Sequence, residues 1–98
     1  MAVWGVTIVP GNPVTYVAPD QPNSPKNIVY ADQTDVVFWN NTTEQDQQIS
    51  LLPGNIVTPE HQSDAFVVPR DATPNSTIAY NSVTEPLATG MIIVTEKK

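Results

Sequence analysis

The chain has 98 residues, 40% of them hydrophobic, and a formal net charge of −6 from ten acidic and four basic residues. It contains no cysteine, which excludes disulfides, thiolate metal sites, iron–sulfur clusters and a cysteine nucleophile. The basic residues are too few and scattered to form a nucleic-acid stripe, and no apolar run reaches the roughly 20 residues of a membrane span. We therefore expect neither a nucleic-acid partner nor a membrane span.

Alternating and apolar runs predict short strands along the first part of the chain. These strands cover residues 2–9, 14–17, 28–30 and 36–39. The turn residues 10–13 make a hairpin of the first two strands. The segment 20–25 holds two prolines and no periodic apolar residue, so it predicts a loop.

The run from Val36 to Trp39 holds four consecutive β-branched or aromatic residues and predicts the central strand, buried on both faces or nearly so. Within it we place Val36 and Phe38 toward the core and Trp39 on the opposite face. Asp32 and Asp35 flank the preceding turn, where Asp is favoured by hydrogen bonds from its side chain to the main chain. Turn formation therefore explains this pair better than acid–base chemistry does.

The second part of the chain predicts further strands at residues 47–52, 65–68, 77–83 and 91–94. In the first of these, Ile49 and Leu51 share one face. Short strands separated by ten prolines, with no helical periodicity, indicate a single all-β domain over residues 1–98, an antiparallel sandwich or barrel.

The order of these elements resembles the cupredoxin family, the plastocyanin-type Greek-key β-sandwich of blue copper proteins. Residues 34–41 stand where that family has Gly-Asp-Thr-Val-x-Phe-x-Asn-Asn, and residues 73–77 stand where it has Pro-Gly-x-Thr or Pro-Gly-x-Ser. The resemblance implies an antiparallel Greek-key sandwich. It leaves two registers for residues 90–94, which are either the closing strand or the penultimate one. The spacing from Pro74 to Gly90 favours the penultimate strand, which implies that the last strand is missing.

The resemblance also implies where copper ligands would fall. A blue copper centre uses two imidazoles, one thiolate and a weak axial ligand. The first histidine position falls on Gln47. In the closing-strand register the cysteine, second histidine and axial positions fall on Asn81, Thr84 and Leu87. In the other register the cysteine position lies beyond Val94, near Glu96, and the remaining two are absent. No copper ligand is present in either register, and we predict no cofactor.

The single histidine, His61, lies between Glu60 and Asp64 in a polar loop. One imidazole and two carboxylates could hold a divalent ion, but this spacing matches no established ligand motif. Ser63 and Asp64 are too close in sequence to His61 for the usual nucleophile geometry. We therefore predict an exposed loop histidine, no metal site and no enzymatic activity.

These observations predict a non-enzymatic, copper-free interaction or structural module. Its partner would be a protein, either the chain itself or another, bound through edge strands, in particular around residues 91–94. An immunoglobulin-like adhesion module and a small metal-binding protein using His61 are the alternatives. If a signal peptide has been removed, the module is periplasmic or extracellular.

Overall fold

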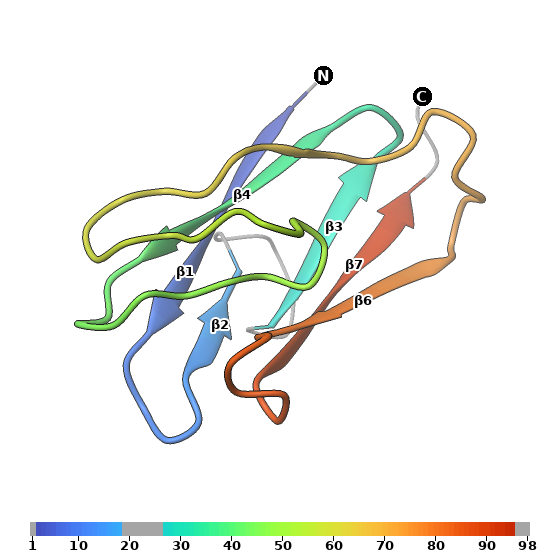
Figure 1. The fold of residues 1–98 in the computed structure, drawn as a ribbon. Helices are drawn as coiled ribbons and strands as arrows, with labels where there is room; N and C mark the ends of the chain where they lie inside the picture. Colours follow the sequence, from blue (N-terminus) through green and yellow to red (C-terminus); the bar gives the residue numbers. More distant parts are fainter. Residues whose placement is uncertain (1, 19–26, 96–98) are drawn as a thin grey trace.

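A computed structural model describes residues 2–18 and 27–95 of the chain, and these form two β-sheets packed face to face (Figure 1). This arrangement confirms the predicted all-β sandwich. The predicted loop at residues 20–25 lies outside the described residues. The strands are β1 (Val3–Val9), β2 (Thr15–Val17), β3 (Ile28–Asp32), β4 (Val36–Asn41), β5 (Phe66–Val67), β6 (Thr77–Asn81) and β7 (Thr89–Thr95).

One sheet, called sheet A, has the strand order β2-β1-β4-β5, and the other, sheet B, has the order β3-β7-β6. The predicted hairpin is confirmed, because β1 and β2 are antiparallel neighbours. Two pairs, β1 with β4 and β3 with β7, are parallel. Both parallel pairs join strands that are distant in sequence: β1 and β4 are the two inner strands of sheet A, and β7 is the central strand of sheet B with β3 at its edge.

The segment 47–52, predicted as a strand, is not one. Gln47 and Ile49 make isolated bridges to Val57 and Ser82, and the chain then turns, with the Leu52 amide donating to the Ile49 carbonyl over 2.9 Å. The apolar alternation of Ile49 and Leu51 comes instead from a loop that presses onto the core, where Ile49 is completely buried.

The central strand β4 alternates strictly, but with the opposite facing to the one predicted. Val37 and Trp39 point into the core and are completely buried, whereas Val36 and Phe38 lie half-buried on the outer face of sheet A. Since side chains in a strand alternate, one wrong assignment reverses them all. An apolar residue stands on the outer face at position 38 because its ring packs over Gly5 on the neighbouring strand. A Cβ atom on Gly5 would lie only 2.8 Å from the Phe38 Cζ atom.

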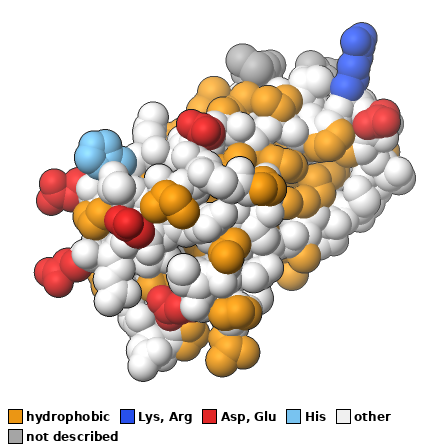
Figure 2. All heavy atoms as spheres, in the orientation of Figure 1, with side chains coloured by type: hydrophobic (Ala, Val, Ile, Leu, Met, Phe, Trp, Pro, Cys, Tyr) orange, Lys and Arg blue, Asp and Glu red, His pale blue; other side chains and the backbone are white. Residues whose placement is uncertain are grey.

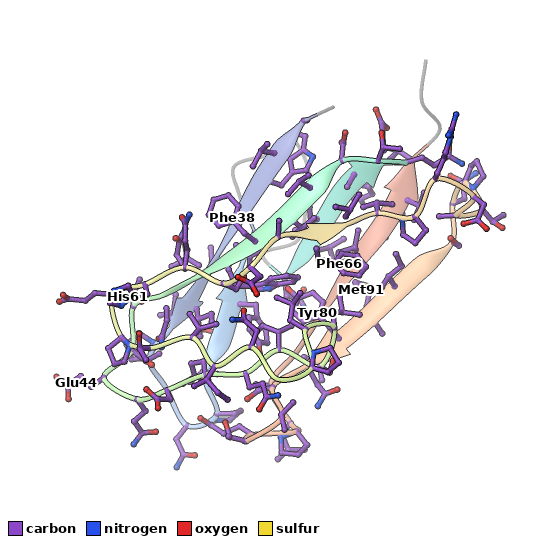
Figure 3. All side chains as sticks on the ribbon, turned by 45° about the horizontal axis from the view of Figure 1, so that its top comes forward. Phe38, Glu44, His61, Phe66, Tyr80 and Met91 are labelled. Carbon is purple, nitrogen blue, oxygen red and sulfur yellow. The ribbon has the colours of Figure 1, made fainter. Side chains whose placement is uncertain are left out.

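Three aromatic rings occupy the centre of the core. The Tyr80 ring meets Tyr16 at a centroid distance of 5.0 Å and Trp39 at 5.1 Å, both edge-to-face. Burial raises the pKa of the Tyr16 hydroxyl to about 12. Gly90 provides the space for Tyr80, since a Cβ atom there would lie 2.4 Å from the Tyr80 hydroxyl. Figure 3 shows Tyr80 and Phe38 on different sides of sheet A.

The turn before β4 is organised by Asp35, which is buried. Its carboxylate accepts hydrogen bonds from the Ala2 amide (2.8 Å), the Asp32 amide (3.0 Å) and the Trp4 indole (3.1 Å). Desolvation acts to raise the pKa of this carboxyl, but the three hydrogen bonds outweigh it and hold the pKa below its ordinary value of 3.8. The turn-forming role predicted for Asp35 is confirmed.

The described part of the chain contains no helix long and apolar enough to cross a membrane.

Candidate functional site

Three loops meet at the end of the sandwich where β4 finishes: the β1–β2 turn, the segment after Asn41 and the β6–β7 loop. The Val83 amide donates to the Gln48 carbonyl over 2.9 Å, and the Ser50 amide donates to the Asn81 carbonyl over 2.9 Å. The β1–β2 turn joins them because the Val14 amide donates to the Glu85 carboxylate over 3.2 Å. We call this surface the loop end.

The buried side chain of Asn41 fixes the segment that follows β4. Its amide group donates to the carbonyls of Gln45 (2.8 Å) and Val57 (2.9 Å). Its side-chain oxygen accepts from the amide (2.9 Å) and hydroxyl (2.6 Å) of Thr43. The sequence carries a signal for this role, because an Asn that bonds the main chain two residues later is a common turn former.

Gln47 lies at the centre of the loop end and is only 2% exposed. Its side-chain nitrogen donates to the Thr43 hydroxyl over 3.2 Å, while its side-chain oxygen has no partner among the described residues. A hollow of about 360 Å³ opens beside it and is lined in part by Thr43, Gln47 and Glu85. The site is therefore a partly buried group of side chains whose oxygen atoms could bind a ligand.

The β6–β7 loop faces this group with residues one position later than those predicted. Ser82 is completely buried, whereas Asn81 is half-buried at the end of β6. Glu85 lines the hollow, and Thr84 is exposed. Ala88 is buried in the same way, while Leu87 is 85% exposed. An isolated bridge joins Ser82 to the buried Ile49 at this point.

The geometry also decides the register of the last strand. Gln47 and the β6–β7 loop lie together at the loop end, as the closing-strand register requires. In the penultimate-strand register, the metal loop would follow β7, whose last residue is Thr95; the Thr95 hydroxyl donates to the Asp32 carboxylate, at the opposite end of β4. That register, and with it the missing strand, is wrong: β7 is the closing strand, and it lies between β3 and β6.

The donors at the loop end do not fit blue copper. Thiolate and imidazole ligands define that centre, whereas Gln47, Ser82 and Glu85 supply amide, hydroxyl and carboxylate oxygens. The chain has no cysteine, and its one histidine is elsewhere.

His61 is exposed, as predicted. Its Nδ1 atom lies 3.0 Å from the Thr58 hydroxyl and 3.0 Å from the Pro59 carbonyl, so the ring is held by its own loop. Glu60 and Asp64 are also exposed, and within the described residues no three or more His, Asp or Glu side chains are placed to hold a metal ion.

Charge is divided unevenly along the molecule. Acidic side chains gather toward the end that carries His61 and Glu44 (Figures 2 and 3), whereas the Lys and Arg colour in Figure 2 stands toward the other end. The Arg70 loop is fixed by the bond from the Gln33 side chain to the Ala72 carbonyl, 2.6 Å.

Comparison with solved structures identifies the fold as cupredoxin-like. A variant of amicyanin in its reduced Cu(I) form at pH 4 matches with a TM-score of 0.66 and 17% identity, over 95% of this chain and 81% of its own. An oxidised amicyanin variant matches with a TM-score of 0.67 and 16% identity, over 95% and 81%. Amicyanin from Paracoccus versutus matches with a TM-score of 0.62 and 14% identity, over 95% and 79%.

At these identities the likeness concerns the fold alone. No family model matches the chain, and no curated protein matches it.

Proposed function

We propose that this chain is a non-enzymatic, copper-free cupredoxin-like domain that acts as a protein-interaction or structural module. The observation that carries the proposal is the donor set at the loop end. Gln47 and Glu85 line the hollow there with amide and carboxylate groups, the Ser82 hydroxyl is buried beside the Glu85 amide, and the chain has no thiolate to form the short copper–sulfur bond of a blue copper site.

The same residues support a non-enzymatic role. The Ser82 hydroxyl is buried, accepts the Glu85 amide at 3.1 Å and lies 3.2 Å from the Thr84 hydroxyl. It has no histidine beside it, because His61 is held in its own loop. A nucleophile needs a base within hydrogen-bond reach, and neither of these two groups, an amide and a hydroxyl, is a base.

The fold supports an interaction role through its exterior. The prediction that residues 91–94 form an open edge for a partner is wrong, since β7 is paired on both sides. The edge strands are β2 and β5 in sheet A and β3 and β6 in sheet B. The immunoglobulin-like alternative has less support, because the matched structures are cupredoxins. A periplasmic or extracellular location stays a prediction.

A copper titration tests the proposal. One equivalent of Cu(II) added to the protein should give no intense absorption near about 600 nm, the region of copper–thiolate charge transfer. The His61→Ala variant is the matched control, because any weak Cu(II) signal that arises from the exposed imidazole should vanish in it. An intense blue band in both proteins would overturn the proposal.

A further inference from the structure

The hollow of about 360 Å³ beside Gln47 has a negatively charged lining. Glu44 is exposed there, Glu85 is half-buried, and no basic residue lines the hollow. A second hollow of about 500 Å³ also has Glu85 in its lining, so the two adjoin, and it adds the exposed Asp46, again with no basic residue. We call the two hollows together the acidic recess.

The hydrogen-bond donors beside Gln47 are largely used within the protein. The hydroxyl groups of Thr42 and Thr43 each donate to a protein oxygen over 2.6 Å. The side-chain nitrogen of Gln47 donates to the Thr43 hydroxyl over 3.2 Å, and the Val14 amide donates to Glu85 over 3.2 Å. A ligand in the acidic recess therefore has to supply donors of its own.

Acceptors remain in the same lining. The side-chain oxygen of Gln47 is buried and has no partner among the described residues. Its amide group lies at the wall of the hollow, because the nitrogen is bonded to Thr43, which also lines it. The terminal torsion of a glutamine is broad, so a small rotation turns the oxygen toward a ligand. A buried acceptor without a donor costs free energy, and a ligand with N–H groups removes that cost.

This lining suits an organic cation better than a metal ion. Among the residues that the structure describes, no three or more His, Asp or Glu side chains are placed to hold a metal. An ion such as Ca²⁺ needs roughly six to eight oxygen ligands. An ammonium group has donors only, and its hydrogen bonds to a carboxylate are charge-assisted and strong.

We propose that the acidic recess binds a primary ammonium group, which donates to the Glu85 carboxylate and to the side-chain oxygen of Gln47. The group has two sources, a free alkylamine or the lysine side chain of a protein partner. The inference goes beyond the proposed function and does not depend on the absence of copper.

Nuclear magnetic resonance titration of the full chain with butylamine tests this inference, and butanol, which has a similar shape and no charge, is the control ligand. Butylamine should shift the side-chain amide signal of Gln47 and the main-chain signal of Glu85 with saturation, and binding should weaken as salt rises. Butanol should leave both signals in place.

Two variants with the same change of charge locate the binding. Glu85→Gln should raise the dissociation constant for butylamine at least about fivefold, because it removes the charged partner but keeps an oxygen for the Val14 amide. Asp64→Asn changes an exposed residue outside the acidic recess and should alter the constant by less than about twofold. Thermal melts of both variants show that each still folds.

Equal shifts with butylamine and butanol, equal weakening in the two variants, or no saturable binding would overturn the inference. A short peptide with one lysine, compared with the same peptide acetylated on that lysine, distinguishes the two sources. Binding of the unmodified peptide that is tighter than that of butylamine assigns the site to a protein lysine, and weaker binding assigns it to a free amine. A copper–thiolate band would overturn the proposed function and leave these results unchanged.

Discussion

Trp39 and Phe38 are adjacent in the sequence but differ in what their loss removes. Trp39 is completely buried and packs edge-to-face on Tyr80, whereas Phe38 is half-buried and covers Gly5. Trp39→Ala should therefore lower the free energy of unfolding by about 3 to 5 kcal/mol. Phe38→Ala should lower it by roughly 1 to 2 kcal/mol. Urea unfolding of the two monomers measures both values, and a larger loss for Phe38→Ala would contradict the facing of β4.

The strand around these residues could be predicted from the sequence, but its facing could not. Four consecutive apolar residues indicate a strand, yet they give no contrast between the two faces. The facing of Phe38 depends on Gly5 on the neighbouring strand, because the Phe38 ring packs over the backbone that Gly5 leaves without a side chain. A pairing between residues so far apart in sequence leaves no local signal.

Asp35 makes the stability of the domain depend on pH. Its lowered folded pKa means that its stabilising contribution is present above the ordinary value of 3.8 and is lost as the pH falls through the folded value. At pH 7 the Asp35→Asn variant should be less stable than the wild type by about 1 to 3 kcal/mol, because Asn cannot accept all three hydrogen bonds. Below the folded pKa the difference should shrink.

Unfolding curves from pH 2 to pH 7 measure this difference. Asp46→Asn is the control, since Asp46 is an exposed loop residue and should change stability by no more than about 0.5 kcal/mol. A gap between Asp35→Asn and the wild type that is constant over this pH range would show that the carboxylate charge has no role in the turn.

At the scale of the strands, two glycines allow close packing on opposite faces. A Cβ at Gly90 meets the buried Tyr80 ring, whereas a Cβ at Gly5 meets Phe38, which borders solvent and can move away. Gly90→Ala should cost about 2 to 3 kcal/mol, as overpacking of a core does, and Gly5→Ala should cost clearly less. Adding Phe38→Ala to Gly5→Ala should remove the clash at Gly5. Thermal melts of the variants would contradict this account if the two alanines cost the same.

The strands themselves were largely predictable, because period-two alternation and proline-rich turns are local signals. The exceptions depend on distant partners. Residues 47–52 follow a strand-like pattern but form only two isolated bridges, from Gln47 to Val57 and from Ile49 to Ser82, and no strand. The position of β7 between β3 and β6 could not be read from its apolar run, which suits either register.

At the scale of the whole molecule, composition carried the most reliable information about the site. The absence of cysteine excluded a thiolate centre, and the position of Gln47 at the loop end agrees with the resemblance. In the β6–β7 loop the closing-strand register predicts the inward-facing residue one position too early, at Asn81 instead of the buried Ser82. The bridge between Ile49 and Ser82 joins residues far apart in the sequence, so no pattern within the loop reveals it.

The central claim is that the folded domain binds no copper ion and does not depend on one for its stability. Thermal unfolding measured with a metal chelator and with excess Cu(II) tests it most directly, because a ligand that binds only the folded state raises the midpoint. We predict the same midpoint in both conditions, for the wild type and for His61→Ala alike. A midpoint several degrees higher with Cu(II) in both proteins would contradict the claim and reveal a copper site independent of the only imidazole.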